Sequence, residues 1–126
     1  MKSGIAKPNT PPLLPRRARE SSKRDYGRLL ILAGSTGYTG APNFASRSAV
    51  RSGAGLVWLG VPERIYNICA LKNDEAMPFP LPCDGRGRLT AEALPEVEAR
   101  LERMDCLAIG PGLGRSEGVV ELVQGV

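Results

Sequence analysis

Two glycine-rich segments carry the residue types best suited to binding chemistry: GSTGYTGAP at 34–42 and GPGLG at 110–114. Each segment follows a short apolar run with the length of a buried strand, and each leads into a helical pattern. Glycines there let backbone N–H groups approach a ligand closely, and the N-terminus of the following helix offers unpaired donors and a positive dipole end. The two loops therefore predict a site for phosphates or other anions and a flat polar ring.

The spacing of these glycines is less specific than their position. The first loop has G-x-x-G-x-x-G spacing, which differs from the G-x-G-x-x-G of dinucleotide-binding folds, and it lacks the GK[ST] of a P-loop. Taken singly, each loop is equally well a tight turn without a ligand. Two such loops on one sheet edge favour a ligand site, because open α/β sheets bind ligands at the carboxyl ends of their strands. Tyr38, within the first loop, either contacts a ligand or is a surface aromatic.

The other reactive residue types exclude several kinds of catalysis. The sequence contains no histidine, which excludes Ser-His-Asp and Cys-His catalysis and histidine-ligated metals. The three cysteines, Cys69, Cys83 and Cys106, form no C-x-x-C pair, so we expect neither a zinc site nor a disulfide framework. Cys106 lies in an apolar run and is expected to be a buried small hydrophobe. The carboxylates suggest no acid–base pair, and we assign no catalytic residue and no metal ligand.

Charge is distributed unevenly along the 126 residues. Residues 1–24 hold seven Lys and Arg against Glu20, whereas residues 25–126 hold ten basic and twelve acidic residues. The first segment is also rich in Pro and Ser, which predicts a flexible basic arm ahead of a domain at 25–126. We expect this arm to be a solvated linker and expect no nucleic-acid partner, since the body has no basic stripe with interleaved aromatics. No segment has the pattern of a membrane span or a secretory signal, so we expect a cytoplasmic protein.

Apolar periodicity divides the domain into alternating strands and helices. Short continuous apolar runs are typical of strands buried on both faces, and a strand, a crossover helix and a second strand make a parallel βαβ unit. We therefore predict an α/β fold with a mostly parallel sheet flanked by helices. The expected strands are 28–33, 56–61, an extended segment at 76–82 and 106–109; the expected helices are 41–52, 63–71, 90–104 and one that begins at Ser116.

Several residues predict how these elements begin, end and face the core. Thr39 is expected near the N-cap of helix 41–52, and Gly53 at its end. Prolines should keep segment 76–82 out of a central position in the sheet, and Pro95 should delay the start of its helix. The inward-facing residues are expected to be Ala41, Phe44, Ala45, Ser48, Ala49 and Ser52 in the first helix and Ile65, Ile68 and Cys69 in the second.

Residues 23–63 carry a family resemblance: KRDYGRLLILAGSTGYTGAPNFASRSAVRSGAGLVWLGVPE. A GS-x-x-Y-[TS]-GAP loop, an Ala-rich helix, a G-[AT]-GLV segment and a V-P-E turn occur there in order, and AIGPGLGR follows at 108–115. This combination resembles the ADP- or ATP-dependent NAD(P)H-hydrate dehydratase family, whose members are relatives of ribokinase and other carbohydrate kinases. The match covers most of residues 12–126 and corresponds to the N-terminal half of the family's domain.

The resemblance implies a ribokinase-like fold and a repair reaction. Members of the family restore NADH and NADPH from their hydrates, NADHX and NADPHX, at the expense of ADP or ATP with Mg²⁺. The resemblance places substrate contacts at Ala41 and Gly112, where the absence of a larger side chain leaves room for a ligand. The neighbouring loop residues complete the expected substrate-binding set: Tyr38, Thr39, Gly40, Gly110 and Gly114. Bacterial relatives often carry an epimerase domain upstream, which makes such a domain an expected partner.

The sequence departs from the family pattern in two places. Ser22, Lys23 and Arg24 stand where the family often has His-Lys-Gly, and the later G-[ST]-G-D motif with its catalytic aspartate is absent from these residues. We therefore expect a truncated ribokinase-like domain that is inactive alone, with an unpaired strand edge that favours homo-oligomers or poor solubility. Two alternatives stay open: a ribokinase-like kinase for a sugar or a vitamin alcohol, which the GYTGAP loop disfavours, and a non-catalytic fragment.

Overall fold

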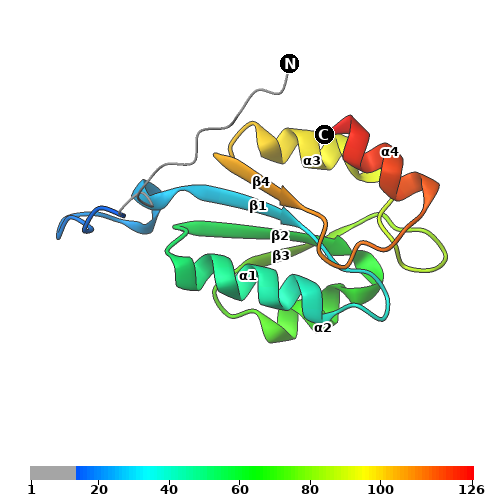
Figure 1. The fold of residues 1–126 in the computed structure, drawn as a ribbon, viewed down its shortest axis with the longest axis horizontal. Coiled ribbons are helices and arrows are strands. Elements are labelled where there is room, and N and C mark those ends of the chain that lie inside the picture. Colours follow the sequence, from blue (N-terminus) through cyan, green and yellow to red (C-terminus); the bar gives the residue numbers. More distant parts are fainter. Residues whose placement is uncertain (1–13) are drawn as a thin grey trace, which may run out of the picture.

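A four-stranded parallel sheet with helices on both faces forms the body of the chain in the computed structural model, which describes residues 14–126 (Figure 1). The strand order is β3-β2-β1-β4, and every neighbouring pair is parallel, which confirms the predicted α/β fold. The strands are β1 (Arg28–Leu32), β2 (Leu56–Pro62), β3 (Met77–Leu81) and β4 (Cys106–Ile109); the helices are α1 (Gly40–Ser52), α2 (Tyr66–Lys72), α3 (Leu94–Leu101) and α4 (Glu117–Gly125). Short 3-10 turns cover Lys23–Tyr26, Glu63–Ile65 and Ala91–Ala93.

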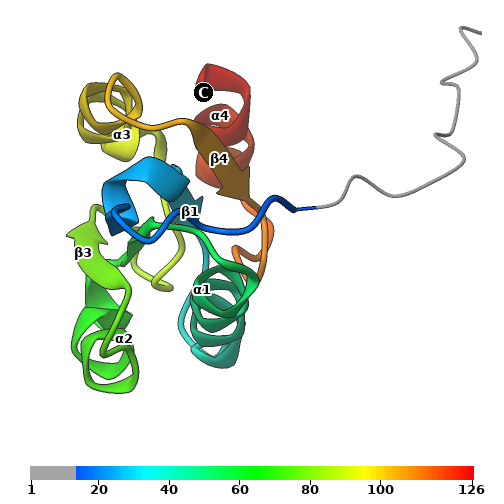
Figure 2. The same ribbon diagram turned by 90° about the vertical axis from the view of Figure 1, so that its left-hand side faces the viewer.

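Each face of the sheet packs against its own pair of helices (Figure 2). Leu30 and Leu32 of β1 lie in the core beneath α3 and α4, whereas Ile31 and Ala33 lie in the core beneath α1 and α2. Successive side chains of a strand point to opposite faces, so a strand covered on both sides must be apolar throughout. The continuous run RLLIL therefore places β1 in the interior of the sheet, with β2 and β4 on either side.

The face by which helix α1 meets the sheet is rotated relative to the predicted one, although Ala45 and Ala49 pack against the core as predicted. Pro42 and Ser46 are its buried residues. The Ser46 hydroxyl is hydrogen-bonded to Oδ1 of Asn73, whose amide nitrogen donates to the carbonyl of Cys69 at 2.8 Å. This buried polar contact holds the helix face, and an apolar pattern cannot reveal it. The residues wrongly predicted to face inward are Phe44, which is 71% exposed, and Ser48 and Ser52.

The ends of the other elements follow the sequence closely. Gly53 ends α1 in the left-handed conformation, with φ of 102°. Thr39 occupies the N-cap position of α1, although its side chain makes no capping hydrogen bond. The proline-rich strand β3 is an edge strand, and Pro95 is accommodated because α3 begins late, after a 3-10 turn. Ser116 caps α4 with its side chain, as the sequence predicts.

Two side chains expected in the core are exposed. Ile68 lies on the outer side of the short helix α2. Cys106 opens β4, which is an edge strand of the sheet formed by residues 14–126, so the start of this strand is covered less than that of an interior strand. An apolar run in the sequence does not distinguish an edge position from an interior one.

The segment before β1 rests against the amino end of the sheet. The N–H of Gly55 donates to the carbonyl of Tyr26 at 2.9 Å, and a Cβ at Gly55 would collide with the carbonyl oxygen of Lys23. The guanidinium of Arg17 donates to the carbonyl of Gly53 at 2.7 Å. A glycine at 55 is therefore required for the 3-10 turn to approach β2 this closely.

The predicted basic arm lies partly outside the structure described here, because residues 1–13 are not among the described residues. Within residues 14–126, no helix is long and apolar enough to cross a membrane.

Candidate functional site

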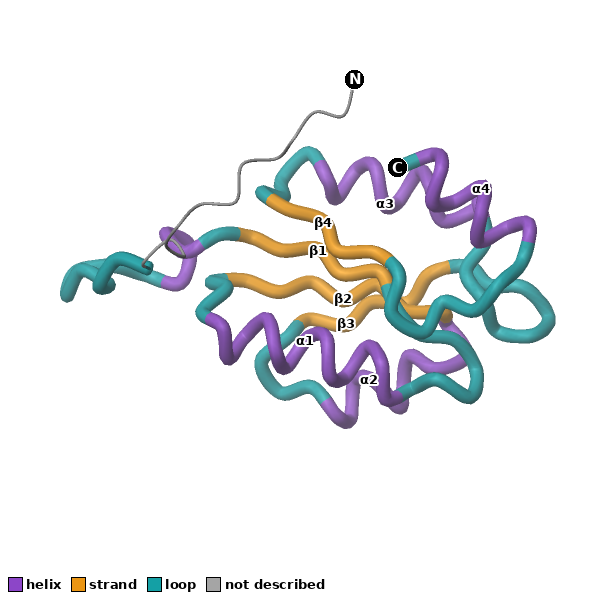
Figure 3. Tube along the Cα trace, in the orientation of Figure 1, coloured by secondary structure: helices purple, strands orange, loops and turns teal. Residues whose placement is uncertain are grey.

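Three loops meet at the carboxyl ends of the strands (Figure 3). The first loop, residues 33–39, follows β1; the second loop, residues 110–116, follows β4; the third loop, residues 82–90, follows β3. The first and second loops contain the glycine motifs that the sequence singles out. Open parallel sheets usually bind ligands at this edge, and the two loops predicted from the sequence lie there.

Hydrogen bonds join the first loop to the second. The N–H of Gly34 donates to the carbonyl of Pro111 at 2.8 Å, and the hydroxyl of Ser35 donates to the carbonyl of Gly112 at 2.7 Å. Ser35 is buried, and this second bond is partly buried. The two glycine motifs therefore form one continuous surface although they are far apart in the sequence.

Gly112 lies directly against Ala41. Gly112 has a φ of +73°, and a Cβ built on it would lie 2.7 Å from Cβ of Ala41 and 3.3 Å from Cβ of Tyr38. No side chain fits at residue 112 without displacing one of these neighbours. Tyr38 is 62% exposed, so its ring is open to a ligand beside the glycine loop. The two residues that the resemblance marks as substrate contacts are thus neighbours across the two loops.

The remaining predicted site residues surround this contact. Gly110 has a φ of +139°, and a Cβ there would meet no atom within 4 Å, so this residue borders open space. Gly114 has a φ of +76° and lies beside Arg88. Thr39 and Gly40 lie at the start of α1. The structure brings all of the predicted residues to one edge of the sheet.

The third loop is a wall of this site that the sequence analysis does not identify. The N–H of Thr36 donates to the carbonyl of Gly87 at 3.1 Å, which joins the first loop to the third. Gly87 has a φ of +71°, and a Cβ on it would collide with the Thr36 hydroxyl. The rule that identifies the other loops, glycines after the carboxyl end of a parallel strand, applies equally to the segment CDGRGR at 83–88.

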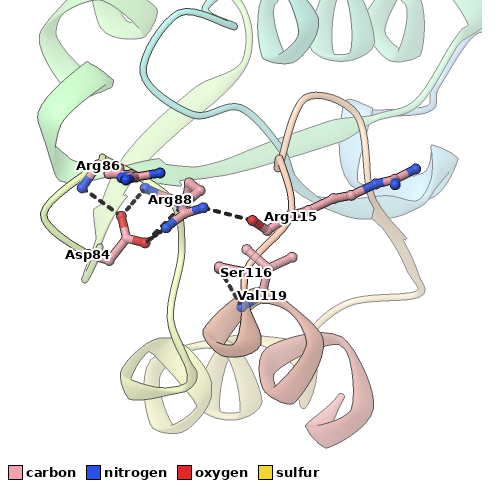
Figure 4. Close-up of polar contacts among 6 residues, drawn as sticks. All are labelled: Asp84, Arg86, Arg88, Arg115, Ser116 and Val119. Carbon is pink, nitrogen blue, oxygen red and sulfur yellow. Dashed lines mark hydrogen bonds and ion pairs between the residues drawn. The ribbon is translucent and has the colours of Figure 1, made fainter.

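Asp84 and Arg88 form the principal charged contact of the third loop (Figure 4). Arg88 Nε donates to Oδ2 of Asp84 at 2.8 Å, and Oδ1 of Asp84 accepts from the backbone N–H groups of Arg86 and Arg88. The backbone N–H of Arg88 is the largest influence that lowers the pKa of the Asp84 carboxyl, followed by the Arg88 side chain. The carboxylate is therefore held ionised and fully engaged within its own turn.

This ion pair predicts a specific response to acid. A carboxyl whose pKa is lowered in the folded state stabilises that state above the ordinary aspartate pKa of about 3.9, and the stabilisation disappears as the pH falls through the lower folded value. We therefore expect the free energy of unfolding of the wild-type chain to fall more than that of Asp84→Asn as the pH is lowered from about 6 to about 2. Urea denaturation midpoints across this range measure the difference; parallel profiles for the two proteins would contradict it.

Among the described residues, the side chains of the three loops include one fully engaged carboxylate and no cluster of metal-ligating groups. Residues 14–126 contain no group of three or more His, Cys, Asp or Glu side chains close enough to hold a metal ion. Asp84, the carboxylate between the loops, is occupied by Arg88 and by backbone N–H groups. What the three loops offer is a surface of backbone groups, small residues and one exposed aromatic ring.

Comparison with known sequences decides the family. The family profile described as NAD(P)H-hydrate dehydratase matches residues 29–126, which include all four α-helices and all four strands except the first residue of β1. The chain belongs to the NAD(P)H-hydrate dehydratase family. Both glycine loops, and the third loop between them in sequence, lie within the matched residues.

Curated members of the NAD(P)H-hydrate dehydratase family match over most of this chain. The bifunctional NAD(P)H-hydrate repair enzyme of Moorella thermoacetica is 44% identical over 111 residues, which is 88% of this chain and 21% of that protein. The ADP-dependent (S)-NAD(P)H-hydrate dehydratase of Streptococcus pneumoniae is 40% identical over 112 residues, which is 87% of this chain and 34% of that protein. The chain thus spans a fifth to a third of the length of these relatives.

Solved structures agree with the NAD(P)H-hydrate dehydratase assignment. The ADP/ATP-dependent NAD(P)H-hydrate dehydratase of Bacillus subtilis, co-crystallised with ATP and Mg²⁺, matches with a TM-score of 0.65 and 30% identity over 90% of this chain and 38% of that one. A ribokinase-like superfamily protein from Enterococcus faecalis matches with a TM-score of 0.71 and 24% identity, over 86% of this chain and 35% of that one. The second likeness shows the ribokinase-like fold.

Proposed function

We propose that this chain supplies the surface that holds hydrated NADH or NADPH in an ADP- or ATP-dependent NAD(P)H-hydrate dehydratase. The contact between Ala41 and Gly112 carries this proposal, because it brings together the two positions that the family resemblance marks for the substrate. Small residues on both sides leave the loop surface accessible to a ring. Tyr38 beside them offers an exposed aromatic face on which a nicotinamide ring can stack.

The other loop residues are proposed to orient the same substrate. Gly110 borders open space, so its backbone can be approached closely. Thr39 and Gly40 begin α1, where free N–H groups and the positive end of the helix dipole favour a phosphate of the dinucleotide. Gly114 closes the surface on the side of the third loop.

In the proposed reaction, the hydroxyl of the hydrated ring takes a phosphoryl group from ADP or ATP. The phosphate then leaves as a proton is lost from the neighbouring ring carbon, which restores the double bond. Such a transfer depends on positioning both partners and on stabilising charge. We assign the positioning of the ring to the three loops.

A chimera tests the proposed function. Residues 29–126 should replace the matching segment of the Bacillus subtilis dehydratase, whose remaining chain supplies the rest of the domain. With NADHX or NADPHX and either ADP or ATP, the chimera is expected to regenerate NADH or NADPH, measured by the near-ultraviolet absorbance of the reduced ring. The Bacillus subtilis enzyme lacking this segment is the inactive control.

The outcomes separate the competing functions. A folded chimera that phosphorylates sugars or vitamin alcohols, detected as nucleotide consumption without recovery of NADH, would support the small-molecule kinase instead. A folded chimera with neither activity would contradict any substrate-holding role for the loops. Recovery of NADH from its hydrate supports the dehydratase.

A further inference from the structure

Arg88 of the third loop reaches across to the second loop. Its Nε donates to Oδ2 of Asp84 at 2.8 Å, its Nη2 lies 2.7 Å from the same oxygen, and its Nη1 donates to the carbonyl of Arg115 at 2.7 Å. Figure 4 shows this guanidinium between the Asp84 carboxylate and the Arg115 carbonyl. One side chain therefore joins two loops that belong to different strands.

Asp84 fixes the direction from which Arg88 reaches out. Its carboxylate accepts from the N–H of Arg86 at 2.9 Å and from that of Arg88 at 3.0 Å. Its own N–H donates to the carbonyl of Arg88 at 2.8 Å, and the N–H of Gly87 donates to its carbonyl at 2.9 Å. The turn is closed on itself, so Arg88 projects from a rigid base.

The second loop is held near its start and near its end. Near its start, Ser35 holds the carbonyl of Gly112. Near its end, Arg88 holds the carbonyl of Arg115, and a Cβ on Gly114 would lie 3.3 Å from Cδ of Arg88, so the stem of this arginine packs close to the glycine backbone. A charged donor to a carbonyl is a strong hydrogen bond, and its loss should loosen residues 113–115.

We infer that Asp84 and Arg88 are positioning residues that hold the GPGLG loop in the shape that binds the dinucleotide. Asp84 orients the Arg88 guanidinium, and the guanidinium fixes the far half of the loop beside Gly112. The effect on affinity rests on the proposed function, whereas the effect on loop order does not. The planar fork of arginine is needed because a lysine ammonium cannot reach Asp84 and the Arg115 carbonyl with the same geometry.

Three variants of the 126-residue chain test this role. Arg88→Gln removes the bridge, Arg88→Lys keeps the charge without the fork, and Arg100→Gln is the matched control. Arg100 also pairs with a carboxylate four residues earlier, Glu96, at 2.8 Å, but within helix α3 and outside the three loops. Dissociation constants for NADPH, a stable stand-in for its hydrate, are measured by calorimetry, and amide hydrogen exchange of Leu113 reports loop order through its bond to the carbonyl of Gly110.

Both changes at Arg88 are expected to weaken NADPH binding about tenfold and to accelerate exchange at Leu113, since a hydrogen bond from a charged group is lost. Arg100→Gln is expected to leave both quantities as in the wild type. Equal weakening by the Arg88 and Arg100 variants would overturn the positioning role, and so would full retention of affinity by Arg88→Lys. If the wild-type chain does not bind NADPH, the proposed function fails, and hydrogen exchange alone tests the contact between Arg88 and the Arg115 carbonyl. Unchanged exchange at Leu113 in Arg88→Gln would then refute the role of this contact in ordering the loop, and faster exchange would support it.

Discussion

Gly112→Val is expected to lower the affinity of the chain for NADPH about a hundredfold. Gly112 has a φ of +73°, a conformation that costs a β-branched residue about 1–3 kcal/mol. The new Cβ would also lie 2.7 Å from Cβ of Ala41, and relieving such overpacking costs about 1–3 kcal/mol more. The second loop must shift to relieve both, and a combined cost of about 3 kcal/mol in the binding surface corresponds to about two orders of magnitude in the dissociation constant.

Calorimetric titration with NADPH measures this loss, and Gly27→Val is the matched control. Gly27 has a φ of +84°, but a Cβ there would meet no atom within 4 Å, and the residue lies before β1, away from the loops. The control should lose stability through backbone strain while keeping its affinity. If Gly112→Val binds NADPH as tightly as Gly27→Val does, the assignment of Gly112 to the substrate site is wrong.

Leu32→Ala is expected to destabilise the fold by about 2–5 kcal/mol. Leu32 is fully buried in β1, an interior strand of the sheet. Its side chain packs tightly against Gly60, because a Cβ added to Gly60 would lie only 2.7 Å from Cδ2 of Leu32. Close packing leaves the neighbours little room to collapse into the cavity, which places the cost well above that of an average substitution. Domains have total stabilities of about 5–15 kcal/mol, so this single change removes a large part of the margin.

Urea denaturation followed by circular dichroism measures the change in the free energy of unfolding. Leu71→Ala removes the same atoms from a side chain that is 86% exposed, and it should change stability by less than about 0.5 kcal/mol. Similar midpoints for the two variants would show that the face of β1 beneath α3 and α4 is not packed as the structure describes.

The parts of the fold that could be predicted are those in which the residue type by itself determines the backbone conformation or the burial of the segment. Continuous apolar runs predict strands covered on both faces, and β2 and the part of β1 after Arg28 are such runs. Pro78 and Pro80 have no backbone N–H to donate to a neighbouring strand, so a strand that contains them is expected at an edge of the sheet, where β3 lies. Gly53, Pro95 and Ser116 begin or end helices as their backbone preferences require.

The errors occur where a tertiary contact decides the outcome. Ser46 is buried and its hydroxyl donates to Asn73, so the buried face of α1 includes a polar residue and leaves Phe44 exposed, while Ala45 and Ala49 pack inward as predicted. Cys106 is exposed because β4 is an edge strand, which no local pattern encodes. Such contacts join residues far apart in the sequence, and periodicity within one element carries no information about them.

The site shows the same division. The position of the glycines after two buried strands predicts two ligand loops, and the family resemblance selects Ala41 and Gly112 among their residues. The structure adds the direct contact between these two residues and the third loop with Arg88. From the sequence alone, an arginine in a turn is expected to be a solvated charge. The structure shows that Arg88 instead donates a hydrogen bond to the carbonyl of Arg115.

The position of the 3-10 turn Lys23–Tyr26 has a practical consequence for experiments on this molecule. The turn packs against the amino end of the sheet beside Gly55, whereas the three loops lie at the opposite end (Figure 1). The five residues of β1 separate the two ends by roughly 16 Å. A dye or a tether to a sensor surface attached at Leu14, which lies beside Tyr26 and Gly53, is therefore held at the end of the sheet opposite the three loops. The proposed substrate site stays unobstructed for titration.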